Sequence, residues 1–406
     1  MRVELKDFTQ AINKVRSLAE GVKNAPGIML EISEDKLNVC YSDGKKSLIE
    51  KIDILDNTEN PLEGRVILNI KQIQNVVESL QPSGAIYTDE IELITEDNGR
   101  MRILGDKKVR FGGEDSTEET VRSKMNYSIN YYRPEESVKY GVISRMNYEG
   151  IFDSDEYDVW AVNELRDILE RTSGEKNKTI YVSSITKTAF VVNLAYVTNI
   201  PITSCENHGF VINTLVAKAV VDILSKLDAE EVKVWVQDKR YVNMISGDNN
   251  VGIWFEMSPG SRTDLNTLQR YEGKDYNKYL LVANKPVLQD VIKASLSLDD
   301  NEKTKITFVE VNGELAMRIV GSASGASSIN DFNIILEMHQ DNVGNILEVS
   351  IPVSLKVILD MLNKCVEDYV AIHIEVDEDN KYIRIGDIVD DDTMSLGTVN
   401  YTISSK

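Results

Sequence analysis

The chain has 406 residues, a formal net charge of −21, 42% apolar residues and 27% charged residues. This composition is typical of folded globular proteins and excludes a mainly disordered chain, and the length exceeds what one hydrophobic core usually spans. No stretch approaches about 18 consecutive apolar residues, and the N-terminus lacks the basic and then apolar plan of a signal peptide. We therefore expect a cytoplasmic protein of several domains that does not enter a membrane.

The residues that most often bind metals or catalyse reactions are few and scattered. The cysteines are Cys40, Cys205 and Cys365, and the histidines are His208, His339 and His373. An odd number of distant cysteines argues against a disulfide framework or a paired-cysteine metal site, and the histidines share no local spacing. The sequence therefore predicts no catalytic centre, no metal site and no cofactor.

Taken from the N-terminus, one structural unit recurs six times along the chain. Each copy reads as a short strand, a helix of about three turns, and then strands rich in β-branched residues separated by turn residues. The six helices are expected over residues 9–20, 70–81, 162–173, 214–227, 285–296 and 353–364. The predicted fold class is therefore α+β, built from six βαβββ repeats.

The fourth copy, which starts near residue 208, shows the pattern most clearly. Its helix has apolar residues at helical spacing, and Val232, Val234 and Val236 then recur at the alternating spacing of a strand. The spacing predicts a buried stripe that contains Leu215, Ala219 and Ile223. Lys218 and Asp222 are then expected on the opposite, exposed face of the helix.

The six units make three pairs, and polar stretches without apolar periodicity separate the pairs. These stretches are residues 112–124 and 258–275, which we expect to be turn-rich joints. The predicted domains are residues 1–121, 122–273 and 274–406. Residues 125–158, with six tyrosines, fit the repeat poorly and are interpreted as an elaborated start of the second domain.

The last unit contains a motif in residues 352–374. Its residues are Val353, Ser354, Leu359, Asp360, Leu362 and Asn363. With this motif, and with six βαβββ units in three pairs, the chain resembles the beta sliding clamps of bacterial DNA polymerase III over nearly its whole length. The resemblance implies a three-domain clamp fold, with helices that line a central hole and antiparallel sheets outside.

Two segments depart from the pattern of that family. The chain ends NYTISSK, where bacterial clamps usually end in a Met-Pro-Met-Arg-Leu-like tail, and a Thr-Asp-Gly-His-Arg-type turn is replaced by FVVNLAYVTN. The departures indicate a divergent clamp with a different partner motif, of a kind that a phage or other mobile element could encode.

The resemblance implies a function without enzymatic activity. Two chains would close head to tail into a homodimeric ring around double-stranded DNA, without reading its sequence and without a cofactor. A clamp loader would open the ring, and short peptide motifs would tether a DNA polymerase to it, in the cytoplasm at the nucleoid. The alternative is a β-rich structural or assembly ring protein of a virus or phage that does not encircle DNA.

An acidic protein can hold DNA only if its charge is distributed unevenly. The six expected helices together carry +3, which leaves −24 for the rest of the chain, and screening limits each charge to about 8–10 Å. Any amphipathic surface helix carries lysines on its exposed face, but lysines recur on five of the six expected helices. The candidate DNA contacts are Lys14, Arg16, Lys71, Lys218, Lys226, Lys293, Lys356 and Lys364.

The resemblance also implies a partner-peptide pocket in the second and third domains. Its candidate residues are Leu194, Tyr196, Val197, Tyr382, Val399, Tyr401 and Ile403. Peptide pockets favour apolar and aromatic linings. Packing of a sheet core explains alternating apolar residues equally well, so both interpretations stay open here.

Overall fold

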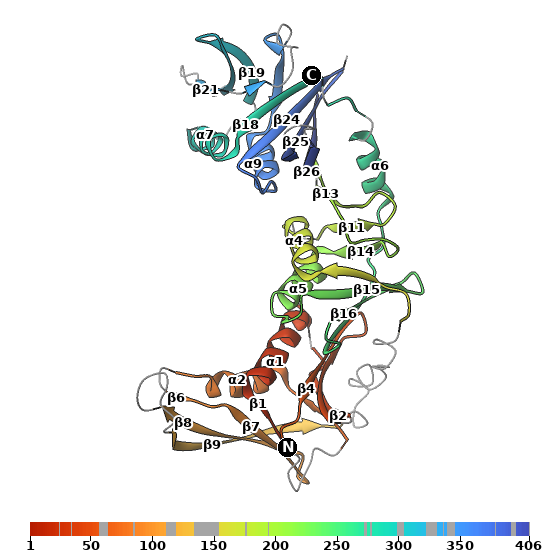
Figure 1. Ribbon diagram of the computed structural model, residues 1–406, viewed down its shortest axis with the longest axis vertical. Helices are drawn as coiled ribbons and strands as arrows, with labels where there is room; N and C mark the ends of the chain where they lie inside the picture. The colour runs from red at the N-terminus through yellow and green to blue at the C-terminus, as the bar shows by residue number, and fades with distance from the viewer. Residues whose placement is uncertain are drawn as a thin grey trace. The chain divides into compact units, whose positions relative to one another are not determined.

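The computed structural model describes most of the chain (Figure 1). The described residues are 1–23, 25–33, 35–56, 64–83, 86–110, 119–133, 154–174, 177–193, 195–271, 274–276, 278–298, 304–321, 331–335, 337–338, 346–377, 379–390 and 395–405. They contain seven α-helices together with mainly antiparallel sheets, which confirms the predicted α+β class. None of the helices in these ranges is long and apolar enough to cross a membrane.

The six predicted βαβββ units are present in chain order. The first contains β1 (Arg2–Glu4), α1 (Leu5–Ala19), β2 (Ile28–Ser33), β3 (Lys36–Ser42) and β4 (Lys46–Asp53). The second contains β5 (Arg65–Leu68), α2 (Ile70–Leu80), β6 (Ile86–Tyr87), β7 (Glu90–Glu96), β8 (Arg100–Arg110) and β9 (Glu119–Tyr132). The third contains β10 (Asp158–Ala161), α4 (Val162–Thr172), β11 (Thr179–Ser183), β12 (Thr188–Val192) and β13 (Tyr196–Pro201).

The remaining units follow the same order. The fourth contains β14 (Phe210–Asn213), α5 (Thr214–Leu224), β15 (Glu231–Gln237), β16 (Tyr241–Ser246) and β17 (Val251–Glu256). The fifth contains β18 (Tyr279–Asn284), α7 (Lys285–Leu298), β19 (Thr304–Val311), β20 (Glu314–Gly321), β21 (Asp331–Ile335) and β22 (Glu337–Met338). The sixth contains β23 (Ser350–Val353), α9 (Leu355–Leu362), β24 (Tyr369–Val376), β25 (Asn380–Asp390) and β26 (Ser395–Ser405).

Neighbouring repeats interlock because each lends its first strand to the sheet of the other. β1 pairs with β7, and β5 pairs with β2. In the second pair of repeats β10 pairs with β15 and β14 lies next to β11, and in the third β18 pairs with β24 and β23 pairs with β19. The strand exchange makes a pair of repeats the smallest assembly in which every repeat has its sheet completed.

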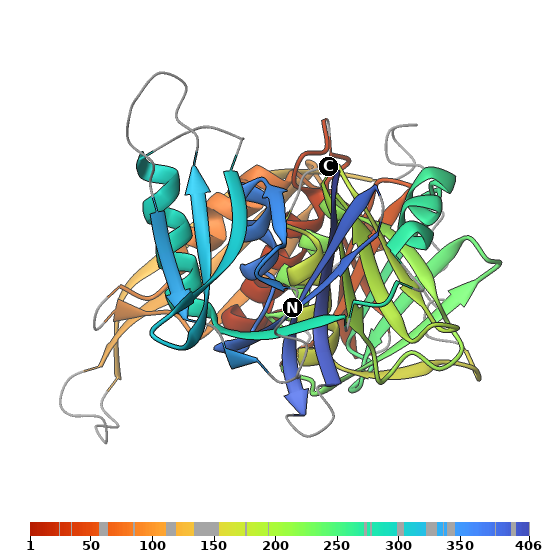
Figure 2. The same cartoon turned by 90° about the horizontal axis from the view of Figure 1, so that it is seen from above.

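The chain forms two compact units that share the third and fourth repeats. The first unit comprises Met1–Glu170, Ser204–Phe210 and Leu215–Met257, and the second comprises Arg171–Thr203, Val211–Thr214 and Ser258–Lys406. A 13-stranded sheet belongs to the first unit, and it becomes continuous where β4 pairs with β17. The second unit has a 9-stranded and a 4-stranded sheet, and α7 lies beside β18 and β21 in both views (Figure 1 and Figure 2). The three predicted domain ranges stay a prediction.

Both stretches that were expected to be joints contain regular structure. A helix, α6 (Arg262–Tyr271), forms within residues 258–275 because two of its side chains, Leu268 and Tyr271, are buried. β9 begins in the other stretch and pairs with β8 and β5, so its residues continue the sheet of the first two repeats. Within the elaborated segment, residues 134–153 lie outside the described residues.

One prediction for the fourth helix, the burial of Leu215, is wrong. Leu215, predicted to be buried, is 63% exposed, whereas Ala217, Val220 and Leu224 of α5 are buried. Ala219 and Ile223 of the predicted stripe are also buried, so the buried face excludes only Leu215. Lys218 is exposed, as the sequence predicted.

Candidate nucleic-acid interface and peptide pocket

Five of the eight cations predicted to contact DNA are exposed to solvent. They are Arg16, Lys71, Lys218, Lys293 and Lys356. Nη1 of Arg16 lies 4.0 Å from Oε1 of Glu78, and Nζ of Lys293 lies 3.8 Å from Oδ1 of Asp290. Exposed ion pairs contribute little to stability, so a phosphate can compete for both cations.

The ammonium groups of Lys226 and Lys364 bind within the protein. Nζ of Lys226, two residues beyond the end of α5, lies 2.6 Å from Oδ2 of Asp222 on α5 and donates to Oγ of Ser17 on α1 at 3.2 Å. Nζ of Lys364 donates to the backbone carbonyl of Arg171 at 2.7 Å. A DNA contact by either lysine has to replace these bonds, so both rank below the exposed cations.

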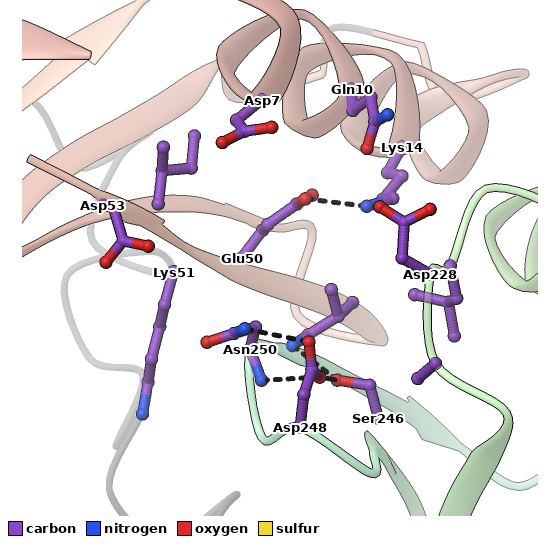
Figure 3. A pocket seen from close by; sticks show the side chains of 14 residues that line it. Asp7, Gln10, Lys14, Glu50, Lys51, Asp53, Asp228, Ser246, Asp248 and Asn250 are labelled. Carbon is purple, nitrogen blue, oxygen red and sulfur yellow. Dashed lines mark hydrogen bonds and ion pairs between the residues drawn. The ribbon is translucent and has the colours of Figure 1, made fainter. Parts of the chain in front are cut away.

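The predicted DNA contact of Lys14 is wrong. Lys14 is 3% exposed, and its Nζ lies 2.7 Å from Oε1 of Glu50 on β4 (Figure 3). It lies one helical turn after Gln10 and two turns after Asp7, so α1 presents all three side chains to the same cavity. Because that face of α1 packs toward β4, the ammonium neutralises a buried carboxylate instead of meeting a phosphate.

The cavity beside Lys14 is acidic, with a volume of about 170 Å³. Its charged lining consists of Asp7, Lys14, Glu50, Lys51, Asp53, Asp228 and Asp248 (Figure 3). Burial raises the pKa of Glu50 above its ordinary value, and the neighbouring Lys14 counteracts part of that rise. Five carboxylates against two lysines make this cavity unsuitable for DNA phosphates, and no described group of three His, Cys, Asp or Glu residues is arranged to hold a metal ion.

The two described histidines have structural roles. His373 is 2% exposed, and burial together with the charge of Arg384 lowers its pKa to about 3, so the ring is neutral at physiological pH. Nδ1 of His208 accepts a hydrogen bond from the backbone N–H of Val236 at 3.4 Å. His339 lies outside the described residues.

The two halves of the predicted peptide pocket meet in one sheet of the second unit. β13 pairs with β26, with Val197 opposite Tyr401. Oγ1 of Thr198 donates to Oδ1 of Asn400 at 2.8 Å, and Oγ1 of Thr402 donates to the carbonyl of Ala195 at 2.7 Å. Residues that are about 200 positions apart in the sequence are thereby held next to each other, as the predicted pocket requires.

The predicted pocket residues divide between the two faces of this sheet. Val197, Tyr401 and Ile403 belong to one apolar cluster, which also contains Tyr181, Phe190, Val192 and Val211. Tyr196 lies in a different core cluster, so it does not share a face with Val197. Successive side chains of a strand point to opposite faces, which separates Tyr196 from Val197. Leu194 lies outside the described residues.

An aromatic group that includes Tyr382 adjoins this face. The ring centroid of Tyr276 lies 6.2 Å from that of Tyr382 and 5.7 Å from that of Tyr401, and both pairs are in edge contact. The ring centroids of Tyr271 and Tyr401 lie 6.0 Å apart. Nζ of Lys274 lies 4.2 Å from the ring centroid of Tyr382. Burial raises the pKa of Tyr276 far above its ordinary value, so its hydroxyl stays protonated. Val399, the remaining predicted residue, is 8% exposed.

The residues that cover this face were not predicted from the sequence. Leu268 and Tyr271 of α6 are 8% and 7% exposed and pack against the cluster around Val197 and Tyr401. Their signal was present in the sequence, because Leu265, Leu268 and Tyr271 recur at helical spacing within a stretch that was interpreted as polar.

Comparisons with known proteins identify the fold. No protein-family model and no curated protein matches the chain. Solved structures do match: the DNA polymerase III beta subunit of Thermotoga maritima is 14% identical with a TM-score of 0.71, and the match covers 100% of this chain and 99% of that chain. The beta subunit of Pseudomonas aeruginosa is 12% identical with a TM-score of 0.71, at 100% and 99% coverage.

A third solved structure gives the same result. Caulobacter crescentus pol III beta is 13% identical with a TM-score of 0.69, and the match covers 100% of both chains. The chain therefore has the fold of the DNA polymerase III beta sliding clamps, as the resemblance in its sequence implied. At this level of identity the likeness establishes the fold, and the function is argued separately below.

Proposed function

We propose that this protein is a DNA sliding clamp. Two copies would close head to tail into a ring around duplex DNA, and short peptide motifs would attach a DNA polymerase and a clamp loader. The protein would act by tethering, without catalysing a reaction. The observation that carries the proposal is the match of the complete chain to the fold of DNA polymerase III beta subunits, with all six interlocked repeats present.

The exposed helix cations support a contact with DNA that is independent of sequence. Arg16, Lys71 and Lys218 belong to the first unit, and Lys293 and Lys356 belong to the second. Cations of this kind bind phosphates by charge and carry no information about bases, which suits a protein that slides. The large negative charge of the remaining surface would keep DNA away from other parts of the protein.

Topological retention tests the proposal without knowledge of the loader. The protein is incubated with linear duplex DNA whose ends are open, the ends are then blocked with a bulky protein, and the complex is washed at high salt. A ring that has threaded onto the duplex stays bound, and cutting the DNA with a restriction enzyme releases it. An assembly protein that does not encircle DNA would show no retention at high salt, and this result would overturn the proposal.

Charge reversal tests the candidate contacts. We expect Lys71→Glu combined with Lys218→Glu to weaken DNA binding at low salt and to reduce the slope of the salt dependence by about 0.9 for each phosphate that the variant no longer binds. Lys239→Glu combined with Lys305→Glu is the matched control, because it changes the charge equally and both lysines are exposed outside the helices. Equal effects of both changes would place the DNA contact elsewhere.

Native mass spectrometry tests the ring. A head-to-tail dimer has twice the chain mass of 45.7 kDa. A protein that stays monomeric at micromolar concentration would count against a ring of two copies.

A further inference from the structure

We propose that the acidic cavity of the first unit, the space of about 170 Å³ beside Lys14, binds a short aliphatic diamine. One ammonium group of the ligand lies between Asp7 and Glu50, and the other lies at Asp228 on the exposed rim. The methylene chain connects the two. This binding is independent of the proposed function, because it involves neither DNA nor the predicted peptide pocket.

Two repeats that are far apart in the sequence form the cavity. The first repeat supplies Asp7 and Lys14 from α1 and Glu50 from β4, and the fourth repeat supplies the segment after α5 and the turn between β16 and β17. All these residues belong to the first unit, and the two repeats are joined where β4 pairs with β17, with Glu50 opposite Val251. A continuous sheet therefore fixes the walls, and a ligand in the cavity contacts both repeats.

The lining has an excess of negative charge. Lys14 pairs with Glu50, and Asp53 pairs with Lys36 on β3. With Lys51, the five carboxylates of the lining thus face three ammonium groups, which leaves two negative charges. A ligand with two positive charges balances this excess.

Several carboxylate oxygens of the cavity have no partner in the chain. Among the described residues, the side chains of Asp7 and Asp228 make no hydrogen bond and no ion pair. Oε2 of Glu50 also has no hydrogen-bond partner there, although Glu50 is only 7% exposed, and Figure 3 shows its carboxylate pointing into the cavity beside Lys14. A buried acceptor without a hydrogen bond is unfavourable, so this oxygen favours a donor that comes from outside the chain.

The negative charges also act on one another. Burial raises the pKa of Glu50, and the charges of Asp7 and Asp248 raise it further, against the effect of Lys14. Despite partial burial, the hydrogen bonds that Asp248 accepts within its turn lower its pKa, so this carboxylate is charged at neutral pH. An ammonium group in the cavity relieves the repulsion among these carboxylates.

The size and lining of the cavity favour an organic cation. A volume of about 170 Å³ holds about six water molecules at about 30 Å³ each, and a short diamine fills the same space. The apolar part of the lining suits methylene groups and consists of Ile52, Leu227, Ala229 and Val251. No group of three His, Cys, Asp or Glu residues in the described part of the chain is arranged to hold a metal ion.

Isothermal titration calorimetry of the full chain, without DNA, tests the binding directly. The probe is 1,4-diaminobutane, and we expect one site per chain with a Kd of about 1 mM or lower, which a ligand of this size can reach. The monoamine 1-aminobutane should bind at least tenfold more weakly. Equal affinity for the monoamine, or tighter binding of Mg²⁺ than of the diamine at the same site, would overturn the proposal.

A charge-neutralising variant locates the site. Asp7→Asn combined with Asp228→Asn removes two charges from the cavity, and we expect the affinity for 1,4-diaminobutane to fall at least tenfold. Asp97→Asn combined with Asp238→Asn is the matched control, because it changes the charge equally at two exposed positions of the first unit outside the cavity. The control should bind the diamine as the wild type does. Unchanged affinity of the cavity variant would show that the diamine binds elsewhere.

Urea unfolding provides a second measurement. A ligand that binds only the folded state stabilises it, so 1,4-diaminobutane should raise the urea midpoint of the wild type, followed by the tryptophans of the first unit, more than NaCl of equal ionic strength does. The cavity variant should show no such difference, and an equal rise in both proteins would contradict the assignment. If the double variant does not fold, Asp228→Asn alone, at an exposed position, should bind the diamine at least threefold more weakly than the wild type.

Discussion

Replacing Lys14 with Met removes the cation that compensates a buried carboxylate. Lys14 and Glu50 are 3% and 7% exposed, and Oε2 of Glu50 has no hydrogen-bond partner among the described residues. Breaking a buried pair by removing one partner typically costs about 3–5 kcal/mol, because the other charge stays buried. Met preserves most of the apolar stem, so we expect Lys14→Met to lower the free energy of unfolding by roughly 3 kcal/mol, at the lower end of that range.

The loss should depend on pH in a definite direction. Burial already raises the pKa of Glu50 in the folded protein, and Lys14 is the strongest influence that lowers it again. Without Lys14 the folded pKa rises further above the unfolded value. A carboxyl group with a raised folded pKa favours folding most below its unfolded pKa, and this contribution is lost as the pH rises through the folded pKa. The variant should therefore be closer to the wild type at about pH 5 than at about pH 8.

Urea unfolding followed by tryptophan fluorescence measures this loss of unfolding free energy in the first unit. The tryptophans are Trp160, Trp235 and Trp254, all in the first unit, which also contains Lys14 and Glu50. Lys71→Met, at an exposed position of α2, is the control and should stay within about 0.5 kcal/mol of the wild type. The double change Lys14→Met with Glu50→Leu should recover most of the loss. A loss under about 1 kcal/mol for Lys14→Met, or no recovery in the double variant, would refute the reasoning.

Three further changes test other parts of the structure. Asn69→Ala removes a side chain that accepts two backbone N–H groups in the first turn of α2, and should cost about 1 kcal/mol in urea unfolding, whereas Asn69→Ser should cost much less. Asp158→Ala removes a carboxylate that is 3% exposed and accepts hydrogen bonds from backbone N–H groups in the segment before β14. It should lower the free energy of unfolding by about 2–3 kcal/mol, and a loss within experimental error would contradict these bonds. Cys40, Cys205 and Cys365 are buried, and burial raises the pKa of the Cys365 thiol to about 12, so a maleimide at neutral pH should label none of them until urea is added, as read by intact mass. Rapid labelling of the native protein would show that the thiols are accessible.

Local periodicity was enough to predict the repeat architecture. A surface helix must bury one stripe, and in α2 this stripe consists of Ile73, Val76, Val77 and Leu80, which the sequence displays at helical spacing. In a strand, buried and exposed residues alternate because successive side chains point to opposite faces of the sheet. The pattern therefore predicted six βαβββ units and their pairing, and the structure contains all six.

The candidate site was only partly predictable, because adjacent residues in a strand point to opposite faces and the pairing partner decides which face matters. Val197 and Tyr401, both predicted to line the pocket, lie opposite each other because β13 and β26 pair. Tyr196 was assigned to the same pocket although it lies on the other face. The cover provided by α6 was missed because a polar stretch with three apolar residues resembles a joint until the sheet beneath it is known.

The sequence by itself determined the repeats, their order and the basic residues on their helices. Only the tertiary structure decided which of these residues meet solvent. Lys14 and Lys71 look alike in the sequence, yet Lys14 lies opposite Glu50, a residue 36 positions away, and Lys71 is exposed. Burial of a charge depends on the strand that packs across from it, and that contact is set by long-range pairing that no local pattern encodes.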